Sequence, residues 1–157
     1  MRILGIDPGI GRLGWAVIEV NSGKLEVKDC GCIETKANSK TEIRLLILFE
    51  QLKEIVKKYQ PEVLAIEDLF FNKNAKTNLI VGEARGIVLL IGAINNMPIF
   101  SYTPLQVKIS LTGYGKAEKS QVGFMVKKIL KIEKMPKTDD VVDALAIAVT
   151  HSFSHKK

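Results

Sequence analysis

The sequence predicts an α/β fold in which a mixed sheet of five strands is flanked by helices. Three strand-like segments follow one another at the N-terminus, as in an antiparallel meander. From about residue 39 onward, helical and strand-like segments alternate, which is typical of parallel strands joined by helices. The chain has 157 residues, of which 46% are apolar, so a single domain over residues 1–157 with a sizeable core is expected.

The N-terminal meander is bounded by turn residues. The strand-like segments Arg2–Asp7 and Gly14–Val20 are joined by a glycine-rich turn. Asn21–Lys24 forms a second turn, which leads into a third strand over Leu25–Thr35. Consecutive strands with such short connections predict antiparallel pairing.

A long helix and a buried strand come next. Ser39–Tyr59 has helical periodicity, and Pro61 ends the helix. Glu62–Glu67 is a short apolar run of the kind found in buried parallel strands. The apolar side of the helix is predicted to consist of Ile43, Leu46, Ile47, Leu52, Ile55 and Val56.

Four further helices and one strand are predicted in the rest of the chain. Asn74–Asn95 is a helix rich in small residues, which could pack closely on a second copy or, equally, on the sheet. Pro98–Tyr102 is the fifth strand. Three helices follow, over Thr103–Leu111, Glu118–Leu130 and Thr138 to about Phe153.

The chain is basic. Lys and Arg total 23 against 17 Asp and Glu, so the formal net charge is +6. This balance favours a polyanionic partner such as nucleic acid, although an ordinary basic protein would have the same composition.

The sequence shows neither a membrane span nor a secretory signal. No apolar run reaches the roughly 18–20 residues that a bilayer-spanning helix needs. The first strand carries an acid where a signal peptide would be apolar. Cys30 and Cys32 are too close on one strand to form a disulfide and are expected to be reduced thiols in or beside the core. These features predict a cytoplasmic protein.

Four carboxylates stand where a predicted strand ends or a predicted helix begins: Asp7, Glu67, Asp140 and Asp143. An acid beside buried apolar residues is costly unless a partner compensates its charge. Glu67 follows a buried run and Asp143 precedes a largely apolar helix, so both favour a functional site. Asp7 could instead cap its turn, and Asp140 could simply suit the positive end of the helix dipole.

These acids are predicted to converge. If the first and fourth strands are neighbours, Asp7 and Glu67 lie at the same edge of the sheet, where ligand sites of α/β proteins are found. The spacing of Asp140 and Asp143 places both on one helical face. Clustered carboxylates repel one another, and bound Mg²⁺ or Mn²⁺ would remove that repulsion. Two such ions about 3.5–4 Å apart can activate a water and stabilise a leaving oxygen.

Several short motifs occur in order along nearly the whole chain. They are Gly5–Gly9, Ala65–Glu67, Phe70, Lys73–Ala75, Gly82–Gly86, Ala117–Val122 and Asp140–Ala146. Each is weak alone, since sugar kinases begin with a similar strand, but the ordered set is highly specific. On these motifs the chain resembles the RuvC family of Holliday junction resolvases.

The resemblance implies a ribonuclease H-like fold, a homodimer, and a nuclease that uses Mg²⁺, two ions per site, or Mn²⁺ in its place. It implies a crossover junction endodeoxyribonuclease, which resolves four-way DNA junctions by paired symmetric nicks in homologous recombination and DNA repair. It also implies work alongside the RuvAB branch-migration complex. A non-catalytic junction-binding module and a ribonuclease H-like nuclease acting on RNA are the alternatives.

The resemblance also assigns the acids. Asp139 is an extra neighbour rather than a matching position. His151 and His155 lie beyond the acids on the last helix and are expected on the surface, not as ligands. The catalytic, metal-binding acids of the family match Asp7, Glu67, Asp140 and Asp143.

DNA contacts are implied in the same way. An aromatic residue near the junction centre matches Phe70, and Phe71 competes for that role. Two DNA-contacting lysines match Lys108 and Lys119. Further phosphate contacts are expected from Lys73, Lys76, Lys116, Lys127 and Lys128. The residues assigned to DNA binding are Phe70, Lys73, Lys108, Lys116 and Lys119.

Overall fold

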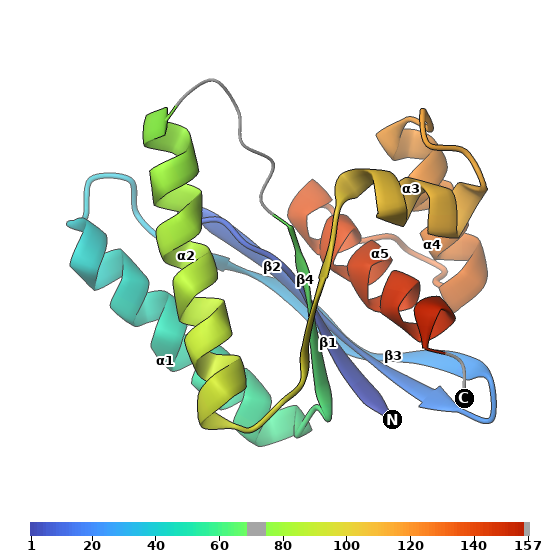
Figure 1. Cartoon of the computed structure of the whole chain (residues 1–157), viewed down its shortest axis with the longest axis horizontal. Helices are drawn as coiled ribbons and strands as arrows, with labels where there is room; N and C mark the ends of the chain where they lie inside the picture. Colours follow the sequence, from blue (N-terminus) through green and yellow to red (C-terminus); the bar gives the residue numbers. More distant parts are fainter. Residues whose placement is uncertain (69–74, 156–157) are drawn as a thin grey trace.

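The computed structural model describes residues 1–68 and 75–155, and the chain forms five strands and five helices within these ranges (Figure 1). In chain order they are β1 (Arg2–Asp7), β2 (Arg12–Asn21), β3 (Lys24–Glu34), α1 (Thr41–Tyr59), β4 (Val63–Glu67), α2 (Ala75–Ile94), β5 (Ile99–Tyr102), α3 (Pro104–Thr112), α4 (Lys119–Leu130) and α5 (Asp139–Ser154). The predicted elements are all present, with ends that differ by one or two residues.

The strands form one mixed sheet in the order β3-β2-β1-β4-β5. The first three strands pair antiparallel, and β4 and β5 run parallel to β1. This confirms the predicted five-stranded mixed sheet. Ile6 pairs with Ile66 across β1 and β4, so the next residue of each strand, Asp7 and Glu67, lies at the same edge.

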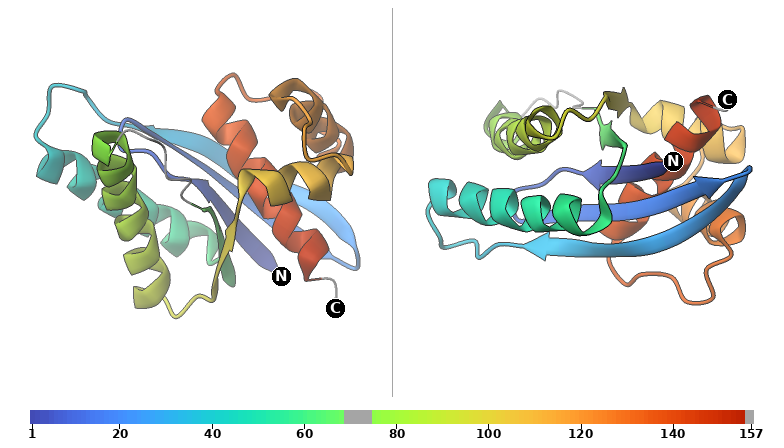
Figure 2. Two further views of the ribbon diagram at one scale, coloured as in Figure 1. Left: turned by 45° about the horizontal axis from the view of Figure 1, so that its top comes forward. Right: turned by 90° about the horizontal axis from the view of Figure 1, so that it is seen from below.

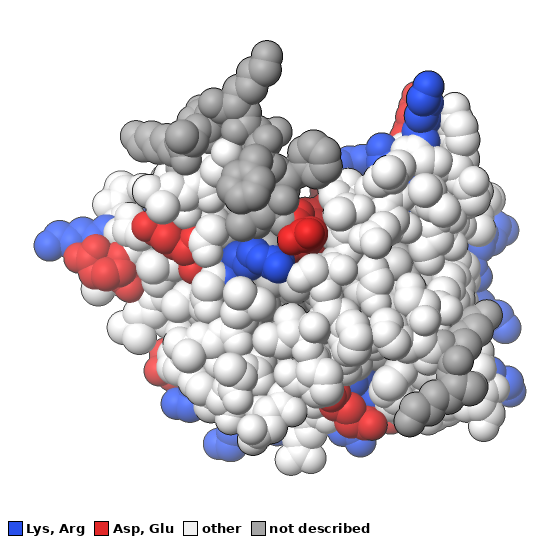
Figure 3. Space-filling model, viewed as in Figure 1, with Lys and Arg blue, Asp and Glu red and all other residues white. Residues whose placement is uncertain are grey.

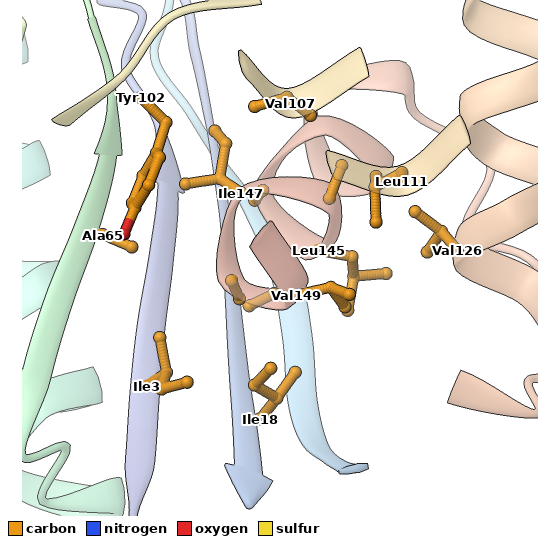
Figure 4. Packing of buried hydrophobic residues seen from close by; sticks show 14 of the residues in the cluster. Ile3, Ile18, Ala65, Tyr102, Val107, Leu111, Val126, Leu145, Ile147 and Val149 are labelled. Carbon is orange, nitrogen blue, oxygen red and sulfur yellow. The ribbon is translucent and has the colours of Figure 1, made fainter. Parts of the chain in front are cut away.

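Helices cover both faces of the sheet (Figure 2). Because side chains alternate along a strand, neighbouring residues enter different cores. Leu4 and Leu64 pack with α1 and α2, whereas Ile3 and Ala65 pack with α3, α4 and α5. Figure 4 shows Ile3, Ile18 and Ala65 pointing from three strands toward the α5 side chains. The sheet therefore separates two apolar layers.

Helix α5 lies deepest of the helices described. Every residue from Ala144 to Ser152 is buried. Two glycines allow the backbone of α5 to touch the sheet: a Cβ at Gly5 would collide with the carbonyl of Ala144, and a Cβ at Gly14 would collide with the carbonyl of Asp140. The close contact brings the start of α5 to the strand end that carries Asp7.

The predicted apolar side of α1 is partly wrong. Ile43 and Leu46 are 48% and 54% exposed, whereas Leu48, Leu52 and Val56 are buried. The helix carries more apolar residues than one packed face can hold, so periodicity alone does not select which of them face the sheet.

The prediction that His151 lies on the surface is also wrong. This residue is 2% exposed, and its Nδ1 lies 2.8 Å from the Tyr102 hydroxyl. Burial lowers the pKa of His151 to about 4, with His155 as a second cause, so the imidazole is neutral. His155 is exposed, as predicted. The hydrogen bond between His151 and Tyr102 satisfies a polar atom of this ring, which is what lets the ring stay in the core.

The sequence-based view of the cysteines is confirmed, since Cys30 and Cys32 are free thiols that pack partly buried against the α5 side of the core. In the ranges that the structure covers, none of the helices has the length and apolar character needed to cross a membrane.

Replacing Gly14 by Ala should destabilise the protein by about 1–3 kcal/mol, because the new methyl group forces α5 away from β2. Gly123→Ala is the matched control: a Cβ there makes only an ordinary 3.7 Å contact with Val142. Since Ala favours a helix over Gly, G123A should be neutral or more stable by up to about 1 kcal/mol. Urea unfolding of both variants tests this, and equal stabilities would contradict it.

Candidate active site

The four predicted acids come from three elements that meet at one edge of the sheet. Asp7 ends β1, Glu67 ends the adjacent parallel strand β4, and Asp140 and Asp143 lie in the first turns of α5. Asp7 and Glu67 share a side-chain hydrogen bond, and both α5 acids are close enough to act on Asp7 electrostatically. The structure thus brings together residues that are up to 136 positions apart in the chain.

A cleft of about 350 Å³ opens over three of these acids. Its polar lining consists of three carboxylates and two lysines: Asp7, Glu67, Asp143, Lys108 and Lys119. Its walls are apolar and come from α3, α4 and α5. Figure 3 shows acidic and basic side chains meeting in a hollow of the front face, above a broad surface that is almost free of charge.

The acids strongly perturb one another. The pKa of Asp7 is raised from 3.8 to about 8. Burial is the largest cause, and the nearby charges of Glu67, Asp143 and Asp140 supply much of the rest. Burial and Asp143 also raise the pKa of Glu67. The hydrogen bond between Asp7 and Glu67 favours a proton on Asp7, which then donates to Glu67. At neutral pH this pair therefore holds a proton when no other cation is present.

Basic side chains compensate the two acids on α5. Lys119 Nζ donates a hydrogen bond to Asp143 Oδ2 at 2.9 Å, and this contact raises the pKa of Lys119. Arg12 Nε lies 3.1 Å from Asp140 Oδ2. That oxygen is buried and accepts no hydrogen bond in the described part of the chain, so the contact with Arg12 is a poorly aligned ion pair.

The donor set suits a hard divalent cation. Carboxylate oxygens are the ligands that Mg²⁺ and Mn²⁺ prefer. A bound cation would lower the pKa of Asp7 and would give the buried Oδ2 of Asp140 a partner. Over residues 1–68 and 75–155, no three acidic, His or Cys side chains are closed around one point as in a preformed metal site. Lys119 and Arg12 instead contact the α5 acids.

The other predicted residues divide into three groups. Lys108 and Lys119 line the cleft. Lys116 is exposed between α3 and α4 but is not part of the cleft lining. Asp139 is exposed on the first turn of α5 and is also outside the lining. Phe70, Phe71 and Lys73 lie outside the described residues.

Two arginines were missed by the reasoning from sequence. Arg12 pairs with Asp140 across the β2–α5 contact, and nothing in its local sequence indicates an acid partner.

Arg85 Nη1 donates to the carbonyl of Glu67 at 2.6 Å, and its Nη2 donates to Ser101 Oγ at 2.8 Å. Arg85 thereby ties the end of β4 to β5 and holds the backbone that carries Glu67. It lies within Gly82–Gly86, so the motif was a signal for its importance.

Comparison with known proteins identifies the family. The family model for the crossover junction endodeoxyribonuclease RuvC matches residues 3–151. The protein of that name from Caldicellulosiruptor saccharolyticus is 52% identical over 155 residues, covering 98% of this chain and 93% of the relative. The structure of Thermus thermophilus RuvC in complex with a Holliday junction substrate is 34% identical, with a TM-score of 0.93, covering 98% of this chain and 94% of that one.

A more distant structure agrees in fold alone. The yeast mitochondrial Holliday junction resolvase is 16% identical with a TM-score of 0.69, covering 96% of this chain and 77% of that one. The predicted ribonuclease H-like fold and the predicted family are both confirmed. With its family match spanning β1 to α5 and its acids gathered where β1, β4 and α5 meet, the chain belongs to the RuvC family of crossover junction endodeoxyribonucleases.

Proposed function

We propose that the chain is a structure-specific endonuclease that resolves four-way (Holliday) DNA junctions during homologous recombination and DNA repair. It hydrolyses phosphodiester bonds by paired symmetric nicks that leave 5′-phosphate ends. One observation carries the proposal: a chain of this family, matched over residues 3–151, retains a half-buried cluster of four acids at a cleft that two lysines also line. A junction-binding module without catalysis would have no use for that costly cluster.

Divalent cations belong to the proposal. Asp7, Glu67, Asp140 and Asp143 would hold Mg²⁺, two ions per site, with Mn²⁺ able to substitute. Bound there, the cations would offset the negative charge that develops on the phosphate and lower the pKa of an attacking water. The raised pKa of Asp7 and the unsatisfied oxygen of Asp140 support this assignment.

The chain's own groups would do the rest. Lys108 and Lys119, at the cleft, would place a phosphate over the acids and compensate its charge. Arg85 would keep Glu67 in position through its backbone carbonyl. The apolar wall of the cleft would exclude bulk water and strengthen these electrostatic contacts.

DNA binding would extend beyond the cleft. We assign it to the predicted set, Phe70, Lys73, Lys108, Lys116 and Lys119. The net charge of +6 supports a polyanionic partner, and phosphate contacts of this kind make affinity fall as salt rises. The substrate would be handed over by the RuvAB branch-migration complex in the cytoplasm, and residues 1–157 would act as one ribonuclease H-like domain.

Paired nicks require two sites, which we propose a homodimer supplies. The outer face of α2 exposes large apolar side chains, with Leu79, Leu90 and Ile94 exposed to 65%, 48% and 57%. Among the described residues, nothing outside the backbone of α2 itself lies within 4 Å of a Cβ position on Gly86, so a partner helix could approach closely there. Apolar patches of this kind are typical of protein–protein contacts. This face is the proposed dimer interface.

Asp7→Asn should abolish cleavage of a synthetic four-way junction in Mg²⁺, with a loss of at least about a thousandfold in rate. The variant removes a central acid while keeping the side-chain size, so junction binding should remain within about tenfold of the unmodified protein. Gel assays of nicking and binding on the junction measure both quantities.

Linear duplex, an RNA–DNA hybrid and EDTA serve as controls for the cleavage experiment. Paired nicks on the junction alone, lost in EDTA and in D7N, support the proposal. Binding without cleavage in every divalent metal would indicate the non-catalytic module, and preferred cleavage of the hybrid would indicate a nuclease acting on RNA.

In EDTA, the stability of the protein should fall as the pH rises from about 6.5 to 8. The folded protein keeps a proton on Asp7 up to about pH 8, whereas the unfolded chain loses it near pH 4, so folding binds a proton throughout this window. The loss should be about 1–2 kcal/mol. His151 acts in the opposite direction, because its lowered pKa adds stability as the unfolded imidazole loses its proton near pH 6.5, but within this window it offsets less than about 0.5 kcal/mol.

Thermal unfolding at several pH values checks this dependence. Asp7→Asn should flatten it and raise stability at pH 8, and Mg²⁺ should restore stability to the unmodified protein. A pH dependence that persists unchanged in D7N would place its origin elsewhere.

Leu90→Glu should convert a dimer into a monomer. A buried carboxylate in each copy should weaken association by at least about 2 kcal/mol, or roughly thirtyfold. Light scattering after size exclusion, without DNA, measures the mass. Phe124→Glu is the control, because Phe124 is similarly exposed but lies on α4, across the sheet. Two variants with the same mass would exclude the α2 face as the interface.

A further inference from the structure

Arg12 contacts the acid cluster but has no part in the chemistry proposed above. It is the first residue of β2, and its Nε lies 3.1 Å from Asp140 Oδ2. The Arg12 side chain is 61% exposed, whereas the Asp140 side chain is 21% exposed. A water-exposed guanidinium thus covers a buried carboxylate oxygen at the edge of the proposed metal site.

This contact is easily exchanged. Asp140 Oδ2 is shielded from water, yet it accepts no hydrogen bond from the described residues, Arg12 included. The interaction is therefore an ion pair without aligned donation, in contrast with the hydrogen bond from Lys119 to Asp143. Ion pairs with one partner largely in water stabilise by only about 0.2–1 kcal/mol.

The backbone keeps Arg12 at this place. Gly14, two residues further along β2, touches the carbonyl of Asp140, so the start of β2 and the first turn of α5 are locked together. Glu34 lies directly opposite Arg12 on β3, on the same side of the sheet. Glu34 is exposed and offers Arg12 a second acidic partner when Asp140 is taken by another cation.

Charge in the acid cluster is thus compensated in three ways in this structure. Asp7 and Glu67 share a proton, Lys119 pairs with Asp143, and Arg12 pairs with Asp140. A divalent cation that uses all four acids has to displace each of these. Of the two basic side chains, Arg12 is the one that lies outside the cleft lining and makes no aligned hydrogen bond to its acid.

We infer that Arg12 is a positioning residue that holds Asp140 while no divalent cation is bound and competes with the cation for that carboxylate. Arg12 thereby sets the affinity of the site for its metal. The inference rests on the proposed function, because it takes the acid cluster as the metal site.

Titration of the metal-free protein with Mn²⁺ alone, without DNA, tests this by calorimetry. Arg12→Gln should bind Mn²⁺ about two- to fivefold more tightly, the fold-change that corresponds to a contact of this exposure. Arg12→Lys keeps a competing charge and should stay within about twofold of the unmodified protein. The rise in Tm on adding Mn²⁺ should also be larger for R12Q than for R12K.

Arg44→Gln is the matched control. Arg44 lies beside the same loop, where its Nε donates to Thr35 Oγ1 at 2.8 Å and its Nη2 approaches Gly11, but it contacts no acid of the cluster. Removing the Arg44 charge measures only the long-range electrostatic effect of a nearby cation on the site. R44Q should therefore change Mn²⁺ affinity by less than R12Q does.

The outcomes separate the two ideas. If Mn²⁺ binding is lost in D7N but R12Q binds no more tightly than the unmodified protein, the role of Arg12 is overturned while the proposed function stands. Equal gains in R12Q and R44Q also overturn it, because the effect would then be general charge. If the unmodified protein binds no Mn²⁺, the metal assignment and the role of Arg12 both fail.

Discussion

The contact between the backbone of α5 and the sheet is the constraint on which the rest of this structure depends. It is possible only because Gly5 and Gly14 carry no side chain where Ala144 and Asp140 approach. A bulkier residue at either position would lift the helix and separate its acids from Asp7 and Glu67. The same contact buries the apolar length of α5, so the packing that stabilises the fold also assembles the site.

That arrangement has an electrostatic consequence. Four carboxylates at the meeting point of three elements would repel one another, and the structure meets this cost with a shared proton and two basic side chains. Such compensation is local and reversible, since a proton, an exposed arginine and a lysine at the cleft rim can each be replaced by a stronger cation. In the proposed function, a site prepared in this way would exchange these partners for a divalent cation.

The two faces of the sheet divide the work. The α5 side holds the acids, the cleft and the lysines, whereas the α1–α2 side carries exposed apolar residues suited to a partner copy. Arg85 links the two, because it projects from α2 to the backbone of Glu67. Through this residue, a shift of α2 on dimer formation would also move the end of β4. The proposed dimer contact and the position of Glu67 would therefore be coupled.

The sequence by itself determined the element order, the mixed five-stranded sheet and the identities of the four acids, because periodicity, turn residues and ordered motifs are local properties. It could not decide which apolar residues of α1 face the sheet, since Ile43 and Leu46 fit the helical period as well as Leu52 does. It placed His151 on the surface, because only the tertiary structure supplies the Tyr102 hydroxyl that satisfies a buried ring. The partners of the acids were equally hidden: Arg12 is 128 residues from Asp140, and only the close contact at Gly14 joins them. Which basic side chains compensate the acids depends on distances in space. The sequence therefore predicted the acids, whereas only the tertiary structure shows which groups neutralise them.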